Sequence, residues 1–420
     1  MEVGNDGVLR KTQKRKSHEM CEDEISRLDE MNQDVLERVL SFLPTSSFYR
    51  LTSVCKRWKS VAESATFKLA CSVVPHRDPW FLMIDSHPNL IHQPIIFDTT
   101  DKNWKKLNHA PPVHLHQNHH SHGGDFIPVA ASGGLICFHS LENNEFIIAN
   151  PVSSTRRHVK PPCATPQPPI RAIAMKSDSK AFKLVLLSGD LPNLTFRQYN
   201  SGADQWGEEI TLTRKINGPV EFESDQTNDD DCTQYFLTKC GDVVSADIQR
   251  SASKQYSSVF TVKSGEEIVH FLSSSGTVVE CNLTRNSFFE YPRLLPVFSE
   301  YSIDLIECNG EMYVVLLSEF LESATLRVWK WNERVESWRQ VAAMPPWMSH
   351  NFYGKKVDIN CSGAGQQILV CVNSPEICSY VMCDLGANEW VELPQCYMDD
   401  GVKEFVCGLS FEPRIEALNM

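Results

Sequence analysis

The sequence lacks the segments that would place it in a membrane or direct it to secretion. No apolar run approaches the ~18 residues of a membrane-spanning helix, and the longest, such as Met312 to Leu317, have strand length. The N-terminal residues contain no apolar stretch of the kind that a secretory signal carries. These absences predict a protein of the nucleus, the cytoplasm or both.

The fifteen cysteines lack Cys-x-x-Cys pairs, although they extend from Cys21 to Cys407. Without a secretory signal, this odd and scattered set indicates buried free thiols in a reducing compartment. Common catalytic motifs are also absent: Gly-x-x-x-x-Gly-Lys, His-Glu-x-x-His, Gly-x-Ser-x-Gly and Gly-x-Gly-x-x-Gly. We nominate no catalytic residue and expect neither a cofactor nor a resident metal.

Composition and charge limit the class of protein and of partner. The hydrophobic fraction of 42% fits a chain that forms a core, and 420 residues allow one small and one large domain. A formal charge of −13 argues against nucleic acid as a direct partner, because phosphate binding needs a basic surface. Residues 1–26 are polar and are interpreted as a disordered tail. Their basic run, Lys11 to Lys16, indicates either a nuclear import signal or an ordinary solvated tail.

Residues 27–66 have the spacing of short amphipathic helices. Asp29 is expected to cap the first helix and Pro44 to end it. Such short helices cannot bury their apolar surface alone, so the rest of the chain or a partner must cover it. The apolar stripe of the first helix comprises Met31, Val35, Leu36, Val39, Leu40 and Leu43.

Two patterns in this stretch are more specific than helical spacing. The chain reads MNQDVLERVLSFLP from Met31 to Pro44, then RLTSVCKRW from Arg50 to Trp58, and both resemble the F-box. Asn32 stands where that family usually has proline, so we expect a looser first turn. The alternative is an ordinary helical hairpin packed on its own domain. The resemblance implies an adaptor-facing surface or internal core formed by Met31, Val35, Leu36, Val39, Leu40, Leu43, Pro44, Leu51, Val54, Cys55 and Trp58.

From about Ser72 onward, short β-type runs broken by Gly, Pro, Asn and Asp replace the helical pattern. In the recurring unit, a run ends in Asp or Asn, and tryptophan or another bulky residue often follows six positions later. We expect the Asp or Asn side chain to close a turn and the tryptophan to pack between neighbouring blades. These anchors are Asp98 with Trp104, Asn150, Asn200 with Trp206, Asp247, Asn282, Asn332 with Trp338, and Asp384 with Trp390.

The spacing of the anchors predicts the architecture. Successive Asp or Asn positions are 52, 50, 47, 35, 50 and 52 residues apart, close to the period of a kelch-type blade. A lone four-stranded blade leaves both faces apolar, so blades must stack in a ring. We therefore predict a small all-α module at 27–66 and an all-β, kelch-type β-propeller at 67–420. The anchors favour seven blades, and the short interval leaves six as the alternative.

The second half contains patterns similar to those of plant F-box/kelch proteins: GGLICF from Gly133, IIANPV from Ile147 and CGLSFEP from Cys407. The resemblance implies a substrate receptor of an SCF-type ubiquitin ligase. Its F-box would dock a Skp-type adaptor, and through it a cullin and a RING protein. The propeller would hold a protein substrate for ubiquitination and degradation, with no chemistry of its own. The alternatives are a non-degradative adaptor that recruits a transcription factor and a kelch-propeller enzyme.

Three irregular stretches interrupt the strand pattern: 109–124, 161–169 and 221–231. The first holds six histidines from His109 to His122 without cysteine or carboxylate, which favours a solvated loop over a zinc or copper site. The third is acidic but lacks the order of a calcium loop. We expect at least one stretch to contact the substrate, on a face clear of the linker at 62–72. The alternative is a shorter loop such as that of Trp347, for which a core role is equally open.

Overall fold

The structure is a computed structural model that divides into two compact units, residues 1–76 and 77–420. No helix in the described residues is long and apolar enough to cross a membrane. The described residues are 31–85, 94–107, 126–153, 155–162, 168–178, 181–215, 235–237, 243–245, 256–273, 276–294, 301–320, 322–398 and 401–418.

The described part of the first unit is helical. Its helices are α2 (Gln33–Ser41), α3 (Thr45–Thr52), α4 (Lys56–Val61) and α5 (Ala65–Ser72). The unit ends at His76 rather than at residue 66, because α5 belongs to its core. Phe67 of α5 is fully buried, and its ring stacks on Phe48 of α3 with the centroids 4.7 Å apart. The predicted boundary at 66 therefore falls inside a helix.

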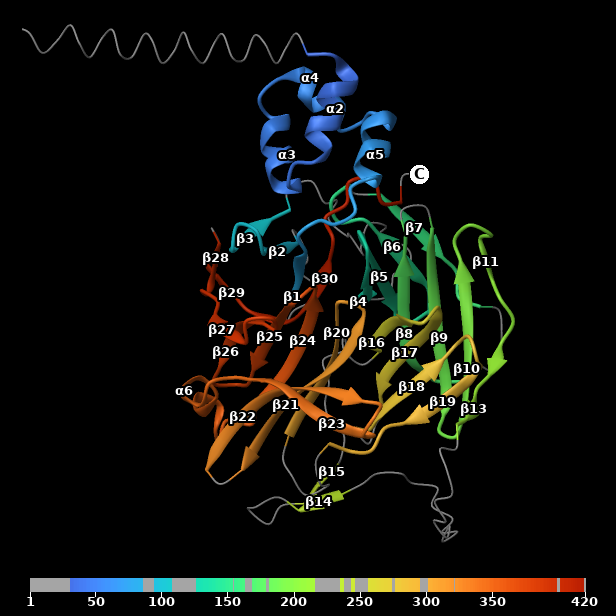
Figure 1. The fold of residues 1–420 in the computed structure, drawn as a ribbon, viewed down its shortest axis with the longest axis vertical. Helices are drawn as coiled ribbons and strands as arrows, with labels where there is room; N and C mark the ends of the chain where they lie inside the picture. The colour runs from blue at the N-terminus through green and yellow to red at the C-terminus, as the bar shows by residue number, and fades with distance from the viewer. Residues whose placement is uncertain are drawn as a thin grey trace, which may run out of the picture. The chain divides into compact units, whose positions relative to one another are not determined.

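The second unit is a β-propeller of six blades, which follow one another around a ring (Figure 1). Written from inner to outer strand, the first blade contains β30 (Phe405–Phe411), β1 (Trp80–Asp85), β2 (Ile95–Asp98) and β3 (Asn103–Lys106). The second contains β4 (Phe126–Ser132), β5 (Leu135–Ser140), β6 (Phe146–Ala149) and β7 (Arg156–Val159). The third contains β8 (Ile170–Ser177), β9 (Phe182–Asp190), β10 (Asn193–Asn200) and β11 (Gln205–Trp206), with β12 (Ile210–Thr211) also paired to β10.

The other three blades complete the ring. The fourth contains β16 (Ser258–Lys263), β17 (Glu266–Leu272), β18 (Val278–Asn282) and β19 (Ser287–Glu290), with β13 (Thr213–Arg214) parallel to β19. The fifth contains β20 (Tyr301–Cys308), β21 (Glu311–Phe320), β22 (Ser323–Asn332) and β23 (Ser337–Ala343). The sixth contains β24 (Asp358–Ala364), β25 (Gln367–Asn373), β26 (Cys378–Asp384) and β27 (Glu389–Glu392). Outside the blades lie the hairpins β14 (Tyr235–Leu237) with β15 (Val243–Ser245) and β28 (Cys396–Met398) with β29 (Gly401–Lys403), helix α6 (Pro346–Ser349) and the 3-10 turn η2 (His350–Phe352).

The ring closes because the last strand of the chain enters the first blade. Inner strands contact one another in the cyclic order β30, β4, β8, β16, β20, β24 and back to β30. Each blade is therefore flanked by two others, which covers both of its apolar faces. Six blades form the ring, not the seven that the anchors favoured. The seventh anchor, Asp247, lies outside the described residues, and the neighbouring β14 and β15 pair only with each other.

The inner strands run in the same direction around the ring. Ser177 near the end of β8 bonds Ser132 at the end of β4, and Cys361 of β24 bonds Asp304 of β20. All inner strands therefore begin at one face, here called the connection face, where the chain returns from the preceding outer strand. The opposite face, the entry face, is where residues 77–79 lead into β1, since β1 is antiparallel to β30. The strands that flank stretches 109–124 and 161–169, β3 with β4 and β7 with β8, meet the connection face.

The propeller core lies between neighbouring sheets. Val315 and Val328 of the fifth blade, for example, pack in one buried cluster with Val370 and Trp390 of the sixth. All cysteines in the described residues are free, and all of them except Cys55 and Cys378 are buried. Burial raises the pKa of the Cys137 thiol, which keeps it protonated.

Candidate functional site

Helix α2 carries an exposed apolar stripe on one side. Val35, Val39 and Phe42 follow one another at intervals of four and three residues, so they share a face. Their exposed fractions are 51%, 50% and 58%. Leu36 and Leu40 lie on another side of the helix and are buried. The helix therefore has one apolar side in the core and another open to a partner.

Asn32 caps the start of α2. Its side-chain oxygen accepts a hydrogen bond from the backbone N–H of Asp34 at 2.8 Å, which satisfies one of the free donors of the first turn. We expected Asp29 to be the cap, but that residue lies outside the described residues, and the cap of this helix is Asn32. The residue that replaces the family's proline thus stabilises the first turn by a different means.

Glu37, a buried residue of α2, joins this helix to α5. Its buried carboxylate accepts hydrogen bonds from the Thr66 hydroxyl at 2.5 Å and from the Gln33 amide at 2.9 Å. Burial raises the pKa of this carboxyl, but hydrogen bonds from Thr66, Gln33 and Ser64 outweigh burial and hold the pKa below its usual value. Arg57 of α4 donates to the carbonyl oxygen of Met31. These bonds fix the orientation of α2 within the helical unit.

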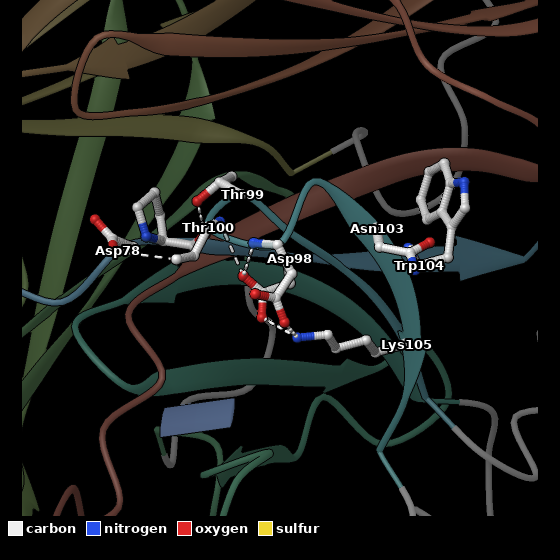
Figure 2. A network of polar contacts seen from close by, with 9 residues as sticks. Asp78, Asp98, Thr99, Thr100, Asn103, Trp104 and Lys105 are labelled. Carbon is white, nitrogen blue, oxygen red and sulfur yellow. Dashed lines mark hydrogen bonds and ion pairs between the residues drawn. The ribbon is translucent and has the colours of Figure 1, made fainter. Parts of the chain in front are cut away.

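The predicted propeller anchors close the turns between third and fourth strands. Asp98 is fully buried, and its Oδ1 accepts the N–H of Thr100 at 2.9 Å and of Asp101 at 3.3 Å (Figure 2). Its Oδ2 accepts a hydrogen bond from Lys105 Nζ at 2.5 Å. Equivalent oxygens accept backbone N–H groups two or three residues ahead at Asn150, Asn200, Asn282, Asn332 and Asp384.

Three anchor tryptophans bond the preceding blade. The indole Nε1 of Trp104 donates to the carbonyl of Pro394, that of Trp206 to Lys160, and that of Trp338 to Pro292, at 2.7–2.8 Å. Each acceptor follows the outer strand of the preceding blade. Trp104 and Trp390 are buried, whereas Trp206 and Trp338 are half-buried. Trp390 donates to Asn388 Oδ1 of its own turn at 3.3 Å.

Asn150 has a second role that its turn position did not reveal. Its amide nitrogen donates to the carbonyl oxygens of Arg414 at 2.8 Å and Ala417 at 2.9 Å. The backbone N–H of Glu412 also donates to the Gly133 carbonyl. A Cβ at the neighbouring Gly134 would approach those of Arg414 and Ala417 to 2.8 and 2.9 Å, so only glycine fits there. The C-terminal segment is thus fastened across the second blade.

Comparison with known proteins agrees with the helical geometry. Residues 28–69 match the family model of the F-box domain. F-box only protein 13 of Arabidopsis thaliana is 49% identical over 421 residues, which cover 97% of this chain and 90% of that protein. The chain is a plant F-box protein. F-box only protein 6 of the same plant is 23% identical over 91% of this chain and 73% of its own length. An F-box/kelch-repeat protein of that plant is 31% identical over 31% of this chain and 29% of its own length.

The structure separates the residues that the F-box pattern groups together. Leu36 and Leu40 are buried; Val35, Val39, Pro44 and Val54 are exposed; Met31, Leu43, Leu51, Cys55 and Trp58 are half-buried. The prediction missed Phe42, whose ring lies 4.9 Å from the Arg38 guanidinium carbon. It also missed Leu69 of α5 and Val73, the residue after this helix, which are exposed by 61% and 60%. Extending the Val35–Val39 spacing by three residues would have found Phe42.

A cleft of about 480 Å³ lies between the fourth and fifth blades of this F-box protein. Glu280 in its wall accepts a hydrogen bond from the Tyr291 hydroxyl and lies 3.5 Å from His270 Nε2. Burial, together with the charge of Glu280, raises the pKa of Tyr291, so its hydroxyl stays protonated. Within the described residues, no three His, Cys, Asp or Glu side chains gather as a metal site. The six-histidine stretch lies outside those residues.

Proposed function

We propose that this F-box protein is the substrate-recognition subunit of an SCF-type ubiquitin ligase. Helix α2 would dock a Skp-type adaptor, which brings a cullin and a RING protein. The propeller would hold a protein substrate near the ubiquitin carrier, leading to ubiquitination and proteasomal degradation. Ubiquitin transfer would be accelerated because the substrate is held near the ubiquitin carrier, not because residues of this chain take part in the reaction.

The exposed stripe of Val35, Val39 and Phe42 carries the proposal. Burying one large aliphatic or aromatic side chain stabilises an association by roughly 1.5–3 kcal/mol. The three side chains come from a helix that Asn32, Glu37 and Arg57 hold in place, so little order must be gained on binding. Free cysteines fit the reducing nucleus or cytoplasm that we propose as its location. The anchor period supports a kelch-type ring.

The test is capture of a purified Skp-type adaptor by the full-length chain. Val39→Asp and Phe42→Asp should each abolish capture and leave the thermal unfolding of the chain unchanged, because both side chains are exposed. Val335→Asp, an equal change at an exposed valine of the turn after β22, should retain capture. Undiminished capture by both α2 variants would refute adaptor docking through this face.

Leu40→Asp is not a suitable test, although the sequence pattern places Leu40 in the same stripe. Leu40 is 3% exposed, so an aspartate there would place an unpaired charge in the helical core and unfold the unit. Loss of adaptor capture would then report unfolding of the helical unit and not the loss of a contact with the adaptor. Substrate half-life with and without the protein separates degradation from a non-degradative adaptor.

A further inference from the structure

Trp347 is the most exposed large apolar side chain of the described residues, at 74%. It belongs to α6, between the outer strand of the fifth blade and the inner strand of the sixth. The next residues along the helix, Met348 and Ser349, are buried at 6% and 1%. The indole is therefore displayed to solvent by an element whose other side is in the core.

The segment around this tryptophan, residues 344–357, is held at several points and is called the α6 platform. Met344, Met348 and Phe352 pack into the core between the fifth and sixth blades. The N–H of Gly354 donates to a Glu319 carboxylate oxygen at 3.0 Å, which ties the platform to the end of β21. A fixed platform loses little conformational entropy when a ligand binds.

The α6 platform is basic in a chain whose formal charge is −13. It contains His350, Lys355 and Lys356 and no Asp or Glu. Neither lysine forms an ion pair with a residue that the structure describes. Glu319, whose carboxylate contacts the platform, bonds the backbone N–H of Gly354. The His350 ring lies parallel to that of Tyr353, with centroids 6.1 Å apart. An exposed indole is thus followed within one segment by unpaired positive charge.

We propose that the α6 platform binds an acidic peptide segment of the substrate protein, with an apolar side chain on Trp347 and Asp or Glu carboxylates on Lys355 and Lys356. The assignment rests on the proposed function and specifies the segment that the propeller recognises. Aromatic side chains are effective anchors in protein interfaces. The two lysines attract the carboxylates of Asp and Glu as point charges, without the planar, bidentate geometry that arginine would impose.

The position of the α6 platform in the propeller fits this role. It joins β23 to β24 and therefore lies at the connection face, opposite the entry of residues 77–79. The next blade-to-blade segment on that face, the hairpin of β28 and β29, presents Tyr397 with 70% exposure. A bound segment that extends from Trp347 would meet a second aromatic side chain on the same face.

The experiment selects short random peptides, displayed on phage, against the full-length chain. Enriched peptides should combine Asp or Glu with Leu, Phe or Trp. Measured by fluorescence anisotropy, their affinity should fall at least about tenfold for Trp347→Ala and for Lys355→Glu/Lys356→Glu, as expected for loss of an anchor. The control Arg334→Glu/Val335→Ala changes an exposed charge and an exposed apolar residue in the turn after β22, at the entry face, and should bind as the parent does.

Several results would overturn the proposal: no enrichment, equal binding by Trp347→Ala, or binding that requires phosphoserine in place of Asp and Glu. Enrichment only after residues 221–231 are replaced by a Gly/Ser linker would identify the chain's own acidic stretch as the occupant, not a partner. Adaptor capture is measured in parallel. A chain that selects acidic peptides but captures no adaptor contradicts the ligase function and leaves the peptide site standing.

Discussion

The indole nitrogen of Trp104 donates a hydrogen bond to the carbonyl oxygen of Pro394, 2.8 Å away and 290 residues later in the chain. The bond joins the first blade to the sixth at their outer strands. At the inner strands, Ser410 of β30 bonds Ser362 and Gly363 of β24. Trp104 also packs edge-on against Phe97 and Tyr380, with centroids 4.9 and 5.5 Å apart. The junction that closes the ring is therefore bonded at both its inner and its outer strands.

Trp104→Ala should destabilise the propeller by about 3–5 kcal/mol, the usual cost of truncating a large buried aromatic. Trp104→Phe keeps ring packing but leaves the Pro394 carbonyl without its donor, so it should cost about 1–3 kcal/mol. Urea denaturation of the full chain measures both. Trp347→Ala is the matched control, because its side chain is exposed, and it should shift the midpoint little. Equal midpoints for Trp104→Ala and the control would show that the junction does not limit stability.

Asn32→Ala should lower the stability of the helical unit by about 1 kcal/mol through loss of the cap on α2. Asn32→Asp should retain stability, since its carboxylate can accept the same N–H and favours the helix N-terminus. Aspartate has the size of the native asparagine and keeps the acceptor oxygen, whereas alanine removes it. Thermal unfolding followed by helical circular dichroism measures the difference. If alanine and aspartate behave alike, the cap contributes nothing.

Asp98→Ala should cost about 2–4 kcal/mol, because the buried turn loses its acceptor and Lys105 loses one of its two carboxylate partners, keeping only Asp101. Asp98→Asn should cost about 1 kcal/mol, since the amide oxygen keeps the bonds to Thr100 and Asp101. Four other turns already use asparagine at this position: Asn150, Asn200, Asn282 and Asn332. Chemical denaturation ranks the two variants, and an asparagine variant as unstable as alanine would contradict the role of the turn.

His139 should make the propeller less stable in acid. Burial lowers the pKa of its imidazole to about 4, although the hydrogen bond with Asn144 acts in the opposite direction. Above about pH 6.5 the imidazole is neutral in both states; as the pH falls toward 4, the unfolded chain binds a proton that the folded chain does not. The resulting loss of stability reaches on the order of 3 kcal/mol below that range. His139→Gln has no imidazole to protonate and should lack this loss. The free energy of unfolding of the parent minus that of the variant should therefore fall as the pH is lowered. A difference that stays constant with pH would refute this assignment.

What the sequence could predict depended on how local each interaction is. Asp98 and Asn282 bond backbone groups two or three residues ahead, so the pattern alone located these turns. The bond from Asn150 to Ala417 spans 267 residues, and no local pattern carries it. The anchor at Asp247 favoured a seventh blade because a local pattern does not show whether its strands enter a four-stranded sheet; the preceding β14 and β15 form a separate two-stranded sheet in the described residues.

The helical unit shows the same limit at the level of single side chains. Val35 and Leu36 are adjacent and both apolar, yet one is exposed by 51% and the other by 1%. Successive helical residues point about 100° apart, so a stripe two residues wide faces both the core and the surface. Telling the exposed residue from the buried one requires knowing where α5 packs, because its Phe67 fills the core beside Phe48.

The first blade is assembled from both ends of its unit, which sets an order for the protein's synthesis. Residues 31–76 leave the ribosome first, while β1 waits for its inner neighbour until residues 405–411 have been made. A message truncated shortly before Phe405 would encode the whole of α2, which we propose to dock the adaptor, and an unclosed ring. If α2 docks the adaptor as proposed, such a product should occupy adaptor without presenting a closed propeller. A late stop codon would then interfere with the normal allele rather than act as a simple loss.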